Sequence, residues 1–164
     1  MAFRILRAKR DDVRHVLGMI EALADYEQLR HLCVATEVAL DAALFGPKPA
    51  AEVLLGWEDE RPVAFALFFH NFSTFLGRKG LYLEDLFVQP AFRRRGYGRA
   101  LLVHLARIAV ERGCGRFEWA VLDWNASAIG FYESLGASVL PDWRITRVTG
   151  SALERLAARA IPAA

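Results

Sequence analysis

A turn rich in arginine and glycine, residues 93–99, joins an apolar stretch to a helical pattern in the middle of the chain. Gly96 and Gly98 lack the Cβ atoms that would keep a phosphate from the backbone or forbid unusual φ angles. A helix beginning here presents unpaired N–H groups and the positive end of its dipole to an anion. Arginine adds a planar fork of donors suited to phosphate. The pattern therefore predicts a pyrophosphate cradle formed by Arg93, Arg94, Arg95, Gly96, Tyr97, Gly98 and Arg99.

Two other phosphate-binding motifs do not fit this turn. A P-loop requires G-x-x-x-x-G-K-[ST], but the lysine of this region, Lys79, precedes the apolar stretch. A dinucleotide-binding fingerprint requires G-x-G-x-x-G, and Leu101 occupies the place of its third glycine. The spacing therefore favours neither an NTPase nor an NAD-dependent enzyme.

The elements that must position the turn follow from hydrophobic periodicity and turn residues. The predicted strands cover residues 3–7, 51–57, 62–69, 81–88, 117–122 and 143–148. The predicted helices run from Asp11 to about Gln28, from Thr36 to Gly46, from the turn to about Gly113, from Asn125 to Gly136, and over 151–160, with a loop around 71–80. This order predicts an α/β chain with a mixed sheet and helices on its faces, and not a pure Rossmann domain.

Composition narrows the classes of partner. The 164 residues carry 21 Lys and Arg against 19 Asp and Glu, a net charge of +2 that is too balanced for a wholly electrostatic nucleic-acid binder. No apolar stretch approaches the roughly 18 residues of a membrane span. Cys33 and Cys114 lie far apart, and the four histidines add no metal-ligand spacing. We therefore expect a cytoplasmic protein without a metal, a nucleic-acid partner or a membrane partner.

Two segments resemble the signatures of the GNAT superfamily of N-acetyltransferases. Arg93-x-x-Gly96-x-Gly98 is similar to the acetyl-CoA motif [QR]-x-x-G-x-[GA], and residues 125–137 are similar to N-x-x-[AS]-x-x-[FL]-Y-x-x-x-G-[FA]. Further segments, at 23–27, 81–88, 124–125 and 143–144, resemble the diamine (spermidine/spermine) and thialysine N-acetyltransferases. The resemblance implies a single GNAT domain over residues 1–164, with a splayed, mostly antiparallel sheet flanked by helices. It also implies acetyl-CoA as donor and a homodimer with the acceptor site near its interface.

The resemblance assigns roles on the donor side. The backbone of Leu86, Phe87 and Val88 would pair with the pantetheine amides of acetyl-CoA like an added strand. Tyr132 would protonate the departing CoA thiolate, an uphill transfer that positioning or a lowered phenol pKa can offset. Asn125 would cap a helix, contact the cofactor, or do both, and Ser127 is counted among the cofactor contacts.

On the acceptor side, Glu84 is the expected general base for the amine, acting through an ordered water or with a pKa raised by burial. The expected substrate contacts are Tyr26, Glu27, Glu84 and Asp85. Each has a plainer interpretation, because an acidic strand end is often only solvated and a helical tyrosine often only packs in a core. The polyamine enzymes also carry acidic residues where this chain has Ser73 or Thr74, so we expect a small primary amine rather than a long polyamine specifically.

Three interpretations remain open at the sequence level. The leading one is an enzyme that acetylates a small amine. The second is a CoA-binding sensor that keeps the fold without turnover, against which the presence of Glu84 and Tyr132 argues. A third interpretation is a protein or peptide N-acetyltransferase, which would need an open groove instead of a closed acidic pocket.

Overall fold

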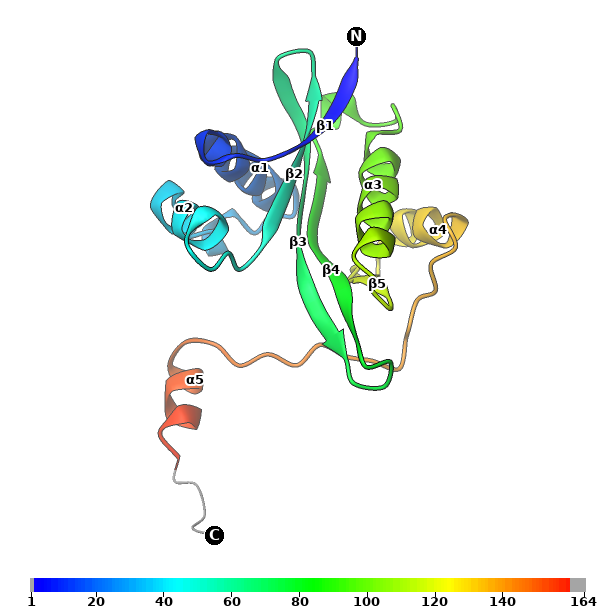
Figure 1. The fold of residues 1–164 in the computed structure, drawn as a ribbon. Helices are drawn as coiled ribbons and strands as arrows, with labels where there is room; N and C mark the ends of the chain where they lie inside the picture. The colour runs from blue at the N-terminus through cyan, green and yellow to red at the C-terminus, as the bar shows by residue number, and fades with distance from the viewer. Residues whose placement is uncertain (1, 160–164) are drawn as a thin grey trace. The chain divides into compact units, whose positions relative to one another are not determined.

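The computed structural model describes residues 2–159. The chain forms two compact units, divided between Ala120 and Val121, and each is described by itself. The first unit holds a five-stranded sheet in the order β1-β2-β3-β4-β5 (Figure 1). Its strands are β1 (Phe3–Arg7), β2 (Glu52–Glu58), β3 (Arg61–Ser73), β4 (Arg78–Val88) and β5 (Phe117–Trp119). β1 to β4 pair antiparallel, and β5 pairs parallel to β4, so the predicted mixed sheet is confirmed.

Helices cover both faces of this sheet. Figure 1 shows α1 and α2 on one side of it and α3 on the other. The first unit contains α1 (Val13–Tyr26), α2 (Glu37–Phe45) and α3 (Tyr97–Glu111), with 3₁₀ turns η1 (Arg10–Asp12), η2 (Arg30–Leu32) and η3 (Pro90–Phe92). The predicted start of α2 is confirmed, because the hydroxyl of Thr36 accepts a hydrogen bond from the Ala39 N–H at 3.2 Å.

The core explains why α1 lies where it does. Val16 and Met19 are three positions apart in α1, so they share one face and are both buried. They pack in a cluster with Leu44 of α2 and with apolar side chains of the sheet. The sheet residues of this cluster are Val53, Leu55, Phe65 and Phe87. Phe87 belongs to β4, so this core fixes the position of the strand that carries the expected donor residues.

The second unit contains two short helices, α4 (Ala126–Ser134) and α5 (Gly150–Ala157). α4 begins and ends as predicted: the Asn125 side chain accepts a hydrogen bond from the Ala128 N–H at 3.2 Å, and Gly136 has a positive φ of 91°. α5 begins one residue before the predicted closing helix over 151–160, whose last residue, Ala160, lies outside the described residues. No helix in the described part of the chain is long and apolar enough to cross a membrane.

Three predicted segments differ from the structure. Residues 71–80 form a long hairpin rather than a loop, because Phe69 to Ser73 continue in register with Tyr82 to Arg78. β5 is shorter than predicted and ends at Trp119. Residues 143–148 form no strand, although their composition favours one. A strand needs a neighbour for its backbone N–H and C=O groups, and the described residues of the second unit contain no other strand.

Candidate functional site

β4 has one unpaired edge close to the arginine-rich turn. β5 pairs only with Leu81 to Leu83, whereas β3 pairs with β4 as far as Val88. In the described part of the chain, residues 84–88 therefore have no strand on the β5 side. An unpaired strand edge offers backbone donors and acceptors to an extended ligand. The expected donor residues Leu86, Phe87 and Val88 lie on this segment, and the Val88 carbonyl already accepts one hydrogen bond, from Arg93 Nε at 3.0 Å.

A β-bulge places Glu84 where this edge begins. Leu67 pairs with Asp85 and Phe68 pairs with Leu83, so Glu84 has no residue opposite it on β3. A bulge bends its strand and redirects the local side chains, and bulges are common next to active sites. Glu84 is exposed, and its neighbour Asp85 is partly buried.

Asp85 is the carboxyl group whose environment is most unusual. Burial, followed by the negative charges of Glu84 and Glu27, raises the pKa of Asp85 to about 6 from an ordinary 3.8. Of the two routes expected for Glu84, an ordered water or burial, burial does not apply, because the Glu84 side chain is exposed and Asp85 is the partly buried carboxyl group. The three acidic residues predicted for the acceptor site therefore do lie close enough to interact, although they come from the end of α1 and from β4.

The expected acceptor residue Tyr26 is connected to the donor side by direct contacts. Its ring lies 6.2 Å from the ring of Phe87, and the guanidinium of Arg93 lies 4.1 Å from its centroid. Tyr26 is the last residue of α1 and is mostly exposed, so it is not simply a core residue. Arg93 thus faces back toward the sheet and bridges the two halves of the predicted site.

The other arginines of the turn point to different partners. Arg95 Nη1 donates hydrogen bonds to both oxygens of Glu58, at 3.0 and 3.1 Å. Arg94 and Arg99 are exposed, and within residues 2–159 neither side chain takes part in a hydrogen bond or ion pair. Sequence reasoning treated the arginines as one cluster. In the described part of the chain, Arg94 and Arg99 are the turn arginines whose side chains have no partner within the protein, so their charge is available to an anion.

The backbone of the turn has the conformation of an anion cradle. Arg94 and Gly96 have positive φ angles of 62° and 83°, and α3 begins at Tyr97. The N–H groups of Tyr97, Gly98 and Arg99 begin the helix and have no intrahelical acceptor. A Cβ added at Gly98 would touch only Val88, at an ordinary 3.8 Å, so nothing within the protein demands glycine there. This fits a turn whose open space is reserved for a ligand.

The remaining predicted residues lie in the second unit on α4. Asn125 caps the helix, Ser127 is exposed in its first turn, and Tyr132 is partly buried. Burial raises the pKa of the Tyr132 phenol, so the lowered value that would ease proton donation is not found. A phenol with a raised pKa stays protonated across the physiological range. The placement of its hydroxyl must therefore lower the cost of transferring the proton.

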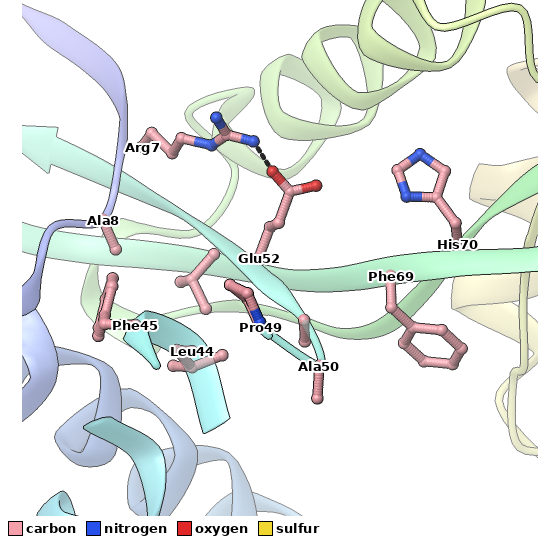
Figure 2. Close-up of a pocket in the computed structure, with 11 residues that line it drawn as sticks. Arg7, Ala8, Leu44, Phe45, Pro49, Ala50, Glu52, Phe69 and His70 are labelled. Carbon is pink, nitrogen blue, oxygen red and sulfur yellow. Dashed lines mark ion pairs between the residues drawn. The ribbon is translucent and has the colours of Figure 1, made fainter. Parts of the chain in front are cut away.

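A separate cavity of about 590 Å³ contains none of the predicted residues. It lies where β1 and α2 end and β2 begins; Figure 2 shows Arg7, Glu52 and His70 on one side of the strands, and Leu44 and Phe69 among the apolar residues on the other. Arg7 and Arg112 both pair with Glu52, so its charge is compensated. Burial, with the charges of Arg112 and Lys79, lowers the pKa of His70.

Sequence reasoning missed Glu58, the buried partner of Arg95. A glutamate at the end of an apolar strand usually faces solvent, and no local pattern distinguishes this one. Within the described residues, no cluster of His, Cys, Asp and Glu could hold a metal ion.

Comparison with known proteins gives consistent results. Residues 19–137 match the model of the acetyltransferase (GNAT) family. The chain is 37% identical to thialysine N-epsilon-acetyltransferase of Bos taurus, over 97% of this chain and 100% of that protein. It is 33% identical to L-ornithine N5-acetyltransferase NATA1 of Arabidopsis thaliana, over 95% of this chain and 88% of that protein. Among solved structures, an integron cassette protein from the mobile metagenome of V. cholerae superposes with a TM-score of 0.82 at 28% identity, covering 97% of this chain and 99% of the other.

Proposed function

The chain belongs to the acetyltransferase (GNAT) family, and from this premise we propose that it transfers an acetyl group from acetyl-CoA to the primary amine of a small lysine-like or diamine acceptor. The transfer is a direct attack within a ternary complex. The observation that carries the proposal is the set of three carboxylates, Glu27, Glu84 and Asp85, beside the unpaired edge of β4. Carboxylates attract an ammonium group, and the open edge receives the donor.

The donor side of the proposal rests on the turn and the strand edge. The N–H groups of Tyr97, Gly98 and Arg99 would hold the pyrophosphate, with Arg94 and Arg99 adding positive charge. Residues 86–88 would pair with the pantetheine amides along the β4 edge. Acetyl-CoA supplies the activated thioester when bound, and the chain's own groups manage the protons.

Deprotonating the amine is the demanding step. An alkylamine with a pKa of about 10.4 is neutral in roughly one molecule in 2,500 at pH 7, which corresponds to about 4.6 kcal/mol. A raised pKa makes Asp85 a stronger base than an ordinary aspartate. Each pKa unit is worth about 1.4 kcal/mol, so a rise of about two units lowers the cost of proton transfer by about 3 kcal/mol. We assign the proton-accepting role to the Glu84–Asp85 pair, with Asp85 as the partly buried base and Glu84 at the solvent side of the bulge.

Tyr132 is the proposed proton donor to the departing thiolate. A phenol with a reference pKa of about 10 transfers its proton to a thiolate of about 8.5 at a cost of roughly 2 kcal/mol. Because burial raises the Tyr132 pKa further, the donor role depends on placing the hydroxyl next to the sulfur. Asn125 and Ser127, at the start of the same helix, are the proposed cofactor contacts of the second unit.

We also propose that the enzyme is a homodimer in the cytoplasm. Trp143 and Ile145 are 79% and 72% exposed, in a segment whose pattern favours a strand that the monomer does not form. Such residues fit a segment that packs against a second copy. The two cysteines are both free, which suits a reducing compartment.

Thiol release over a panel of amines tests the proposal. Acetyl-CoA is incubated with the protein and with thialysine, ornithine, lysine, diamines, spermidine, an aminoglycoside or a lysine-containing peptide. We expect CoA release with one class of small amines, and none with the corresponding alcohols. Binding of acetyl-CoA without release by any amine would favour a sensor, and release with the peptide alone would favour a protein acetyltransferase.

A further inference from the structure

Glu58 is a buried acidic residue directly beneath the cofactor turn. It ends β2 and is 7% exposed. Its two oxygens accept hydrogen bonds from Arg95 Nη1, and one of them also accepts a short hydrogen bond from the Tyr97 hydroxyl. The Tyr97 hydrogen bond, followed by that from Arg95, lowers the Glu58 pKa against the opposing effect of burial. The carboxylate is therefore charged at neutral pH.

The two donors to Glu58 lie on either side of Gly96. Arg95 precedes it and Tyr97 follows it, so one carboxylate fixes both ends of the residue at which the chain turns into α3. The ring of Tyr97 is also stacked on Phe3, with centroids 3.9 Å apart and planes within 3°. The ring of Phe3 packs closely over Gly56, where an added Cβ would come within 2.7 Å of it.

This arrangement holds a backbone that is not favourable by itself. Arg94 has a φ of 62°, which is uncommon for a residue other than glycine, and Gly96 has a φ of 83°. A conformation of this kind persists only when surrounding contacts hold it in place. The Arg95 and Tyr97 contacts supply that support, and they also turn Arg95 away from any anion at the helix start.

We propose that Glu58 is a positioning residue for the acetyl-CoA site: it holds residues 94–97 so that the N–H groups at the start of α3 face the pyrophosphate. The inference rests on the proposed function for the identity of the ligand. It assigns Glu58, Arg95, Tyr97 and Phe3 to one clamp that never touches the reacting atoms. If the ion pair served stability alone, its loss would not weaken acetyl-CoA binding selectively while leaving turnover unchanged.

The first test compares Glu58→Gln with Glu60→Gln. Both variants remove one negative charge near the end of β2, but the Glu60 side chain is fully exposed. We expect Glu58→Gln to raise the KM for acetyl-CoA and the Kd for CoA about tenfold, the size associated with hydrogen bonds to a charged group, with kcat little changed. Glu60→Gln should match the wild type. A fall in kcat at unchanged KM, or an equal effect of Glu60→Gln, would overturn the proposal.

Tyr97→Phe provides a second variant that removes only one hydroxyl. It should raise the same KM, and the Glu58→Gln/Tyr97→Phe double variant should show less than the product of the two single effects, because both act through one contact. Fully multiplicative effects, or a Tyr97→Phe variant with wild-type KM, would contradict the clamp.

A measurement without acetyl-CoA separates the clamp from the proposed function. Trypsin cleaves after arginine, and residues 93–95 form a turn whose accessibility depends on how firmly it is held. Glu58→Gln should be cleaved there about tenfold faster than wild type and Glu60→Gln, as expected when one hydrogen bond to a charged group is lost. Equal cleavage rates would overturn the clamp. A wild-type protein that binds no acetyl-CoA but shows this difference would overturn the proposed function alone.

Discussion

In the proposed mechanism, the carboxyl group of Asp85 would connect acceptor binding to proton transfer. Replacing it by asparagine keeps its shape but removes the base, so we expect Asp85→Asn to lower kcat/KM about a hundredfold, a typical contribution of general base catalysis. In the wild type, kcat/KM should rise with pH through about 6 as Asp85 ionises. The variant should lose that limb of the profile. If Asp85→Asn kept the rise of kcat/KM near pH 6, that rise would belong to another group. Glu84→Gln, at the neighbouring carboxylate, is the matched comparison.

Replacing Asp85 should also stabilise the folded protein above pH 6. Because the folded-state pKa of Asp85 is raised, its contribution to stability is fully present below its unfolded pKa of about 3.9 and is lost as pH rises through about 6. Above pH 6 the ionised group therefore destabilises the fold, by up to about 3 kcal/mol for two pKa units. Urea unfolding should show Asp85→Asn to be more stable than wild type at pH 8 but not at pH 4. The opposite order would contradict the burial of this carboxyl.

Tyr132 should affect chemistry rather than donor affinity. Tyr132→Phe keeps the ring and removes the acidic proton, so we expect turnover to fall about a hundredfold, with acetyl-CoA affinity nearly intact. Stopped-flow turnover and calorimetric binding of acetyl-CoA measure the two quantities separately. Wild-type turnover in this variant would remove Tyr132 from the mechanism.

The arginines of the turn should differ in how they respond to salt. Arg94 is exposed and available to phosphate, so Arg94→Gln should weaken CoA binding about threefold to tenfold and reduce its dependence on salt. Arg107→Gln, on the exposed side of α3, is the control. Charge reversal at Arg95 should also weaken binding, because it places a second acidic group against Glu58. A Kd unaltered by Arg94→Gln would exclude a direct phosphate contact from that side chain.

At the scale of elements, the start of α3 connects the fold to the proposed donor site. Gly96 and Gly98 are needed for different physical reasons. Gly96 has a φ of 83°, whereas Gly98 is helical and has room for a methyl group inside the protein. One is required by the backbone, and the other is required only if a ligand approaches.

This difference gives a prediction for the helix start. Gly96→Ala should lower the free energy of unfolding by about 1 kcal/mol or more, because alanine resists a left-handed φ. Gly98→Ala should leave stability unchanged or raise it by up to about 1 kcal/mol, since alanine favours helix. It should nevertheless weaken acetyl-CoA binding. Thermal unfolding and binding of both variants test the pair, and a Gly98→Ala protein that binds normally would argue against close approach of the pyrophosphate.

At the scale of the whole molecule, the segment after α4 carries several exposed apolar side chains. Leu140, Trp143 and Ile145 are each more than half exposed. If this segment packs against a second copy, a Trp143→Ser/Ile145→Ser protein should be monomeric under conditions in which wild type is a dimer. Light scattering after size exclusion gives the mass, and Val110→Ser, an exposed residue of α3, is the control. A monomeric wild type would refute the proposed dimer.

Local features of the fold were predictable from the sequence. The helix starts at Thr36 and Asn125 and the end of α4 at Gly136 depend on side-chain hydrogen bonds and φ preferences within a few residues. The turn at 93–98 was predictable for the same reason. Strand extent was less predictable, since the β3–β4 hairpin and the unpaired segment 143–148 depend on whether a partner strand is present.

The sequence by itself therefore determined the family, the donor motif and the candidate carboxylates, because motif spacing and helix caps are short-range properties. Only the tertiary structure decided which acidic residues are buried or partly buried, which arginines remain available, and that Glu58 lies beneath the turn. Burial and charge–charge distance are set by the packing of α1, β2 and β4, which lie far apart in the chain. A shifted pKa or a clamp that depends on such distances therefore cannot be predicted from the residue pattern of any single segment.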